Sequence, residues 1–234
     1  MGATDGAIGK VKGFYFDDET WTIRYLVVET GNWLFSHKVI IPTEVLSTNY
    51  QEHEVFAVNL TKEQIKSSMD IGTAKHLLHP KKIILHDHYS LKFDGNSRNY
   101  GFDKQESTYK LLSFEEDNEA SEKPDPNAHL RSTDKVIGYN IMAVDGKIGD
   151  VEDFIIDDCN WNLDFMVVDA GDLCPGKKVI ISQKWIKETN WNSSSVIVNA
   201  SVEYVKNSHE YDSSQPMSDV YSYVLHDYYG KYAL

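Results

Sequence analysis

Four histidines that lie close together in the first half of the chain have the type and spacing to hold a metal ion. They are His76, His79, His86 and His88. The first two are three residues apart, which can place both side chains on one face of a helix. The competing interpretation is ordinary surface histidines, with a structural hydrogen bond for His86, and we favour it. We therefore expect no cofactor and keep metal binding here as the alternative.

Two pairs of adjacent carboxylates could provide acid–base chemistry or bind a cation. These are Asp17-Asp18 and Asp157-Asp158. Each pair stands where the chain must turn between apolar segments, and aspartates at turns commonly accept hydrogen bonds from backbone N–H groups. A Ca²⁺ site would need several more oxygen ligands nearby, which the sequence does not supply at loop spacing. We predict that both pairs cap turns.

The sequence offers no recognisable catalytic arrangement. It contains no glycine-rich phosphate loop, G-x-S-x-G, H-E-x-x-H or C-x-x-C motif, so no nucleophile can be paired with a base. The two cysteines, Cys159 and Cys174, fit no zinc or redox spacing, and we interpret them as free thiols in a reducing compartment. We expect a protein that is not an enzyme.

The charge and hydropathy of the chain argue against nucleic acid as a partner and against a membrane-spanning segment. The net charge is −13, with 23 Lys and Arg against 36 Asp and Glu, so the chain repels phosphate backbones and we exclude nucleic acid. No stretch approaches the roughly 18 apolar residues that a membrane helix needs, and no apolar run follows Met1 that would indicate a signal peptide. We expect a soluble, cytoplasmic protein without a transmembrane segment.

An internal repeat dominates the organisation of the chain. The segment beginning at Asp5 recurs 140 residues later at Asp145, and the match continues without a gap between residues 3–92 (the first copy) and 143–232 (the second copy). Of the four histidines only His86 meets another histidine, His226. A feature present in both copies serves the shared fold, whereas a feature of one copy reflects drift or specialisation.

The second copy predicts a small β-rich domain. Strands are expected over 136–144, 148–156, 163–168, 177–181 and 194–198, with Asp145-Gly146 as a hairpin turn and a bulge or a strong bend where alternation breaks in 148–156. Short helices are expected over 201–207, with Ser201 as its N-cap, and over 218–228. Short strands separated by turns predict a mainly β fold, a small barrel or a strongly twisted sheet.

The first copy lacks the counterpart of strand 136–142. Its sheet must therefore be open, be completed by another segment, or belong to a chain whose start has been trimmed. An exposed edge invites pairing with a second molecule, which predicts a homodimer. Residues 93–129 are polar and acidic and predict a linker. We divide the chain into domain 1 (1–92), this linker (93–129) and domain 2 (130–234).

Aromatic residues at the turns and loops are candidates for partner contacts. Trp21 and Trp161 follow the two aspartate pairs, and we predict that both indoles pack on the domains. Trp33, Leu34 and Phe35 form an apolar loop that the second copy does not share, so they are candidate partner-binding residues.

The repeated motifs resemble the PRC-barrel family. They are DGKIGDVEDFIIDDCNWNLDFMVVDAG (145–171) and GKKVIIS (176–182), matched in the first copy by DGAIGKVKGFYFDDETW, LVVETGNW and HKVIIP. The whole chain is similar to bacterial tandem PRC-barrel proteins in which HLRS, here residues 129–132, precedes the second barrel. The resemblance implies two tandem small PRC-like β-barrels, each followed by short helices, like the barrel of the photosynthetic reaction centre H subunit.

The resemblance implies binding more than chemistry. In the H subunit the domain caps a membrane complex and influences electron transfer, and in a ribosome maturation factor it binds a ribosomal protein. This chain has no membrane helix and no RNA-processing domain, so an H-subunit-like role rests on analogy of fold alone. We expect an adaptor that binds another protein, which could be membrane-associated. The alternative is a metal- or small-molecule-binding sensor that uses a cleft between the two barrels.

Overall fold

The computed structural model describes residues 1–31, 37–47, 56–67, 129–171 and 173–214. The expected helix over 218–228 and nearly all of the expected linker lie outside these residues. The elements of the first half are β1 (Gly2–Ala3), β2 (Gly6–Ala7), β3 (Gly9–Asp17), β4 (Thr22–Thr30), β5 (His37–Pro42), η1 (Thr43–Val45) and α1 (Lys62–Lys66). Those of the second half are β7 (Asn140–Ala143), β8 (Gly146–Asp157), β9 (Asn162–Asp169), β10 (Lys178–Ser182), η3 (Gln183–Trp185), β11 (Ile186–Asn190), β12 (Ser195–Val198) and α4 (Val202–Lys206). Between the halves stand β6 (Leu130–Ser132) and α3 (Thr133–Val136).

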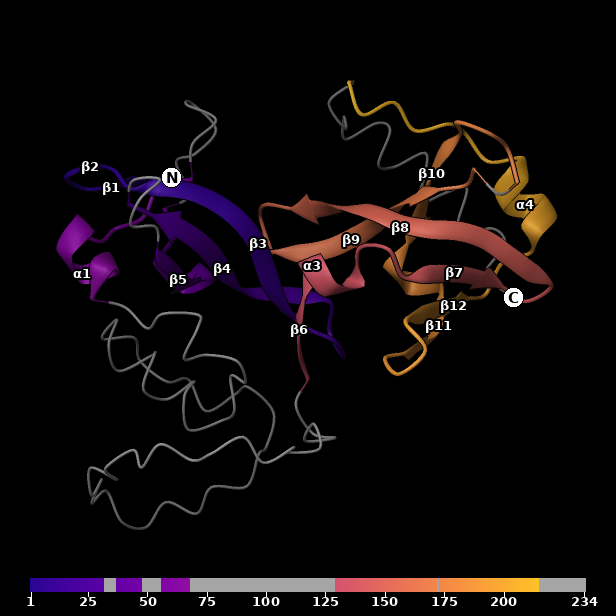
Figure 1. Cartoon of the computed structure of the whole chain (residues 1–234), viewed down its shortest axis with the longest axis horizontal. Helices are drawn as coiled ribbons and strands as arrows, with labels where there is room; N and C mark the ends of the chain where they lie inside the picture. Colours follow the sequence, from indigo (N-terminus) through magenta and orange to yellow (C-terminus); the bar gives the residue numbers. More distant parts are fainter. Residues whose placement is uncertain (32–36, 48–55, 68–128, 172, 215–234) are drawn as a thin grey trace, which may run out of the picture.

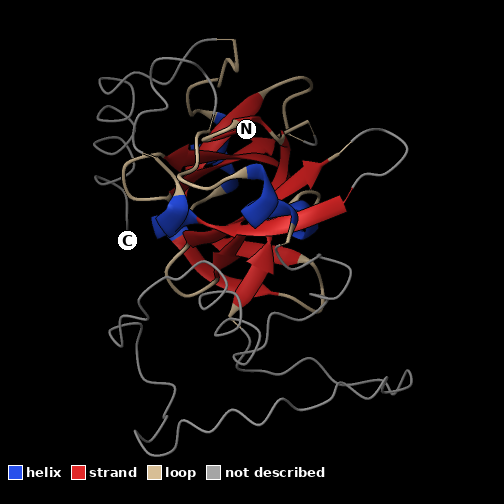
Figure 2. Ribbon diagram, turned by 90° about the vertical axis from the view of Figure 1, so that its left-hand side faces the viewer, coloured by secondary structure: helices blue, strands red, loops and turns tan. Residues whose placement is uncertain are grey.

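The expectation of a mainly β fold is confirmed. Strands make up most of the described chain, with a few short helices (Figure 2). One sheet runs through both halves in the order β11-β12-β7-β8-β9-β4-β3-β6, with β10 paired to β9 and β5 to β4. Figure 1 shows the two halves beside one another along the long axis of the molecule. No helix of the described residues is long and apolar enough to cross a membrane.

The two halves share strand registers as well as sequence. Val11 pairs with Val28 in β3–β4, and Val151 pairs with Val168 in β8–β9. Each pairing has two register shifts, and they fall at equivalent positions 140 residues apart. The bulge that the broken alternation predicts in 148–156 is therefore present, and its equivalent bends β3 in the same way.

Steric contact explains why a glycine ends each D-G-x-I-G motif. A Cβ at Gly149 would lie 1.9 Å from the carbonyl oxygen of Asp169, and one at Gly9 would lie 1.9 Å from that of Glu29. Only glycine lets the two backbones approach this closely.

One expected strand begins later than predicted. The strand expected from residue 136 starts at Asn140, because Thr133–Val136 form the helical turn α3. Gly138 then reverses the chain with φ +85°, in the left-handed region that glycine adopts readily. Helix α4 follows the prediction, with the Ser201 hydroxyl accepting a hydrogen bond from the N–H of Tyr204.

Strand β6 supplies an edge of the first half. Leu130, Arg131 and Ser132 pair antiparallel with Asp17, Phe16 and Tyr15 of β3. The segment that leads into the second half is thus part of the sheet of the first, and it covers β3 near the point where the two halves meet.

The halves join through a reciprocal pair of backbone hydrogen bonds. The N–H of Ile23 donates to the carbonyl of Trp161 at 2.7 Å, and the N–H of Leu163 donates to that of Trp21 at 2.8 Å. Trp21 is 6% exposed within a core cluster formed mostly by the second half, and Trp161 packs against the cores of both halves. The prediction that both indoles pack is confirmed.

Candidate functional site: a groove between the halves

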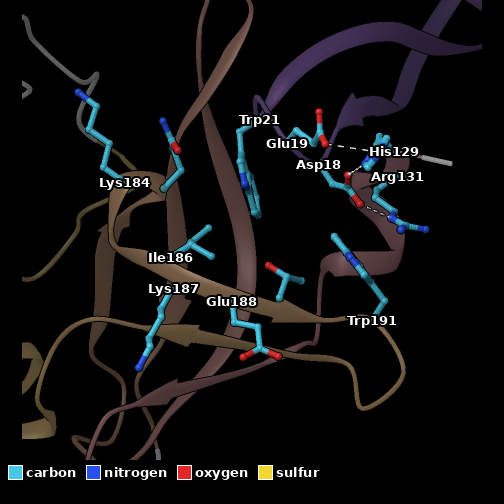
Figure 3. Close-up of a pocket in the computed structure, with 12 residues that line it drawn as sticks. Asp18, Glu19, Trp21, His129, Arg131, Lys184, Ile186, Lys187, Glu188 and Trp191 are labelled. Carbon is cyan, nitrogen blue, oxygen red and sulfur yellow. Dashed lines mark hydrogen bonds and ion pairs between the residues drawn. The ribbon is translucent and has the colours of Figure 1, made fainter. Parts of the chain in front are cut away.

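A groove of about 580 Å³ lies where the two halves meet. One wall comes from the β3–β4 turn and the segment at β6, and the other from η3, β11 and the turn after it (Figure 3). The residues that line it are Asp18, Glu19, Trp21, His129, Arg131, Gln183, Lys184, Ile186, Lys187, Glu188, Thr189 and Trp191. The groove combines aromatic rings with charges of both signs.

The β3–β4 turn is held by its first aspartate. The Asp17 carboxylate accepts hydrogen bonds from the N–H groups of Glu19 and Thr20 at 3.1 and 3.0 Å. The Trp21 N–H donates to the Asp17 carbonyl, and Trp21 adopts φ 55°. The expected capping role is confirmed for Asp17, and for Asp157, which accepts the N–H of Cys159 at 2.8 Å.

The second aspartate of the first pair has a different role, which the sequence did not reveal. The Asp18 carboxylate, 8% exposed, accepts from Arg131 Nε at 2.7 Å and lies 3.0 Å from His129 Nδ1. His129 Nε2 also lies 3.6 Å from a carboxylate oxygen of Glu19. The Asp18 N–H donates to the His129 carbonyl at 2.7 Å. These contacts, the Asp18 cluster, fix the start of β6 against the turn.

Arg131 also contacts the second half of the chain. Its guanidinium carbon lies 4.4 Å from the centre of the Trp191 ring, a cation–π contact. The Trp191 ring in turn lies 6.1 Å from that of Tyr139. Arg131 therefore links an acid of one half to an aromatic residue of the other and fixes the spacing of the two walls at that end of the groove.

The wall of the groove formed by η3 and β11 carries two lysines on either side of a buried tryptophan. Trp185 of η3 is 4% exposed and packs on Tyr204 of α4, with ring centres 5.3 Å apart. On either side of it, Lys184 and Lys187 are exposed, and neither amine forms an ion pair with another described residue. This wall can offer positive charge to a ligand while its backbone stays fixed.

Several of the residues singled out in the sequence lie outside the described part of the chain. These are the loop residues Trp33, Leu34 and Phe35 and the histidines His76, His79, His86 and His88. Both cysteines are free, Cys159 exposed and Cys174 half-buried. Asp157, Asp158 and Cys159 come close enough to hold a cation, but the exposure of Asp158 and Cys159 and the capping role of Asp157 explain this grouping without one.

Comparison with known families identifies part of the first half. The PRC-barrel domain family matches residues 1–64, so this segment contains a PRC-barrel domain. It spans β1 to the greater part of α1, together with the aspartate turn that forms one wall of the groove. Among curated proteins no match to the chain was found.

Proposed function

Starting from the PRC-barrel domain at residues 1–64, we propose that the chain is a non-catalytic binding protein and that the groove between its halves receives another protein. We extend the PRC-barrel assignment to the second half, because its strand registers repeat those of the first. A role like that of the reaction centre H subunit would follow from fold analogy alone.

One observation carries the proposal: the groove is built by both halves and braced by the Asp18–Arg131–Trp191 contacts. Two domains that share a continuous sheet create between them a surface that neither has alone. Aromatic side chains and arginine at a fixed site are the residue types enriched where proteins bind one another.

The chemistry of the groove favours binding over catalysis. The acid and the imidazole that lie closest, Asp18 and His129, contact each other, and Asp18 also holds Arg131. No serine or cysteine is among the described residues that line the groove. An acid that orients an imidazole can serve a base, but no serine or cysteine stands beside His129 among the described lining residues to act as its nucleophile.

We propose a different protein as the partner; the expectation of a homodimer stays a prediction, since β6 covers only part of the edge of β3, which runs from Gly9 to Asp17. The open edge of the first half motivated the expectation of a homodimer. Within one chain, β6 already pairs with that edge over Tyr15–Asp17. The groove remains the described surface with the features of a binding site.

Site-specific photo-crosslinking tests the proposal in the full chain. A photoreactive phenylalanine analogue replaces Lys184 in the groove or, as the control, Lys10, an exposed residue of β3 outside it. Each protein is irradiated in an extract of the source cells. A defined crosslinked partner from position 184, absent at position 10 and reduced by Trp191→Ala, supports the proposal. No product, or identical products from both positions, contradicts it.

A further inference from the structure

The two strands that end the order of the sheet face each other across the groove. Strand β6 ends the order in one direction and β11 in the other, and residues of both line the groove. An edge strand presents backbone N–H and C=O groups that have no neighbouring strand to bond. We propose that an extended polypeptide segment of a partner protein lies in the groove and pairs with the outer edge of β11. This inference rests on the proposed function and specifies how the same groove binds.

The hydrogen bonds between β7 and β12 show which backbone N–H and C=O groups of β11 face away from β12. The Asn140 N–H donates to the Ser194 carbonyl in the parallel pair β7–β12. Strand alternation then directs the backbone of Ile197 toward β11, where its register partner is Glu188. The next residue, Thr189, therefore points its N–H and C=O away from β12. Thr189 also lines the groove, so a strand paired with this donor and acceptor would lie along the groove.

The shape of the groove fits an added strand. Four consecutive residues of β11, Ile186 to Thr189, line it. The groove therefore borders four of the five residues of β11. The register shift between Ile186 and Glu188 marks a bulge within this segment. In this mode main-chain hydrogen bonds supply affinity and side-chain contacts supply specificity.

The side chains around the edge define the chemistry of the segment. Trp21, Ile186 and Trp191 offer apolar contacts. Lys184 and Lys187 offer amines without ion pairs to described residues, and Glu188 places one carboxylate beside Lys187. The segment that matches is extended, alternates apolar with acidic residues and places its carboxylates at the two lysines.

Two of the registers in which a second copy of the chain could pair with this edge are disfavoured. Two β11 strands that pair antiparallel about Glu188 would set this carboxylate opposite its own symmetry mate, and pairing about Lys187 would do the same with two amines. Like charges directly opposite destabilise a strand pair. The two lysines favour an acidic partner strand, which meets neither clash.

The test uses synthetic peptides and the full chain. The probe is a fluorescein-labelled peptide, Ser-Val-Glu-Val-Glu-Val-Ser, with a version in which lysine replaces each glutamate. Fluorescence anisotropy is expected to show binding of the acidic peptide at least about tenfold tighter than that of the basic one. Lys187→Glu should weaken the acidic peptide by about tenfold, and Lys10→Glu, the matched charge change outside the groove, by less than about twofold. Equal affinities for the two peptides overturn the proposal.

Two N-methylated isomers of the acidic peptide test strand pairing itself. One carries methyl groups on the valine nitrogens and the other on the glutamate nitrogens, so each blocks one edge of the extended peptide. Because only one edge can face β11, one isomer should lose binding by about tenfold or more and the other should retain it. Equal binding of the isomers overturns strand pairing and leaves groove binding, tested by the crosslinking, intact.

A pair of variants tests the same point from the protein side. Thr189→Pro removes the N–H that opens into the groove without removing a bond to β12, whereas Thr189→Val keeps it. The first should abolish peptide binding, and the second should change it by less than about twofold. Binding that survives in a folded Thr189→Pro protein contradicts the proposal. If this variant does not fold, the N-methylated isomers decide alone.

Discussion

Replacement of Asp18 by alanine removes the carboxylate that both His129 and Arg131 contact. The Asp18 side chain is 8% exposed, and those of His129 and Arg131 are 29% and 26% exposed. The substitution therefore leaves a guanidinium and an imidazole partly buried without the acceptor that they share. It also removes the link between the β3–β4 turn and β6, so both the stability of the protein and the shape of the groove should change.

The expected loss follows from the burial of these contacts. Breaking a fully buried ion pair costs about 3–5 kcal/mol, but Arg131 and His129 can each recover part of their hydration through their exposed quarter. A charge-assisted bond to Arg131 then contributes about 1.5 kcal/mol, and the bond to His129 about 1 kcal/mol. Asp18→Ala should thus lower the free energy of unfolding by about 2–3 kcal/mol. For a chain of this size, that corresponds to a fall in Tm of about 4–12 °C.

The repeat provides a matched control at Asp158. This residue occupies the equivalent place in the second half and is exposed, whereas the Asp18 side chain is 8% exposed. Asp158→Ala should change stability by no more than about 0.5 kcal/mol. Urea unfolding followed by tryptophan fluorescence measures both variants, and hydrogen exchange at the Asp18 N–H, which donates to the His129 carbonyl, reports local opening. Equal losses in the two variants, or unchanged exchange in Asp18→Ala, would refute a special role for the Asp18 cluster.

Two further predictions concern stability. The Tyr25 hydroxyl is buried and has no hydrogen-bond partner among the described residues, so Tyr25→Phe should raise the free energy of unfolding by about 0.5–1 kcal/mol. Burial, and to a lesser extent the charge of Glu44, raises the pKa of Tyr25. The contribution of neutral Tyr25 to the free energy of unfolding should therefore be full below the ordinary tyrosine pKa of about 10 and be lost as the pH rises above it. Urea titrations at pH 8 and pH 10.5 should show a smaller loss of stability at the higher pH in the variant than in the parent. An equal loss would contradict this reasoning. Gly149→Ala should cost about 2–3 kcal/mol in thermal unfolding, since its Cβ would meet a carbonyl oxygen at 1.9 Å. At Gly171 the nearest atom is the side-chain oxygen of Asp169 at 3.1 Å, so Gly171→Ala should be nearly neutral, and comparable losses at the two glycines would show the steric argument to be wrong.

Local features of the fold could be predicted from the sequence because their causes are local. Alternation of apolar residues predicts β8, its interruption predicts the bulge, and the N-cap Ser201 predicts α4. The capping role of Asp17 follows from its place in a turn. Each of these depends on contacts within a few residues, where spacing constrains the geometry.

The groove could not be predicted because its contacts are distant in sequence. Asp18 and Arg131 are 113 residues apart, and β6 is only three residues long, too short to show a strand pattern. Nothing in the spacing of Trp21 indicates that it packs on the core of the other half. Such contacts depend on how the two halves dock, which local patterns of hydropathy do not specify.

A comparison of the two copies gives the strongest argument that the groove is specialised. The residues equivalent to Lys184 and Lys187 are Glu44 and Ser47, so the first copy has an acid and a neutral residue where the second has two amines. Likewise Asp18 is buried in ion pairs, whereas its equivalent Asp158 is exposed. The glycines and the aspartate caps, which the fold needs, occur in both copies. Positive charge at the edge of β11 is not required by the shared fold, since the first half forms without it. In a chain of net charge −13, two amines without ion pairs to described residues beside an open strand edge are best explained by the carboxylates of a partner.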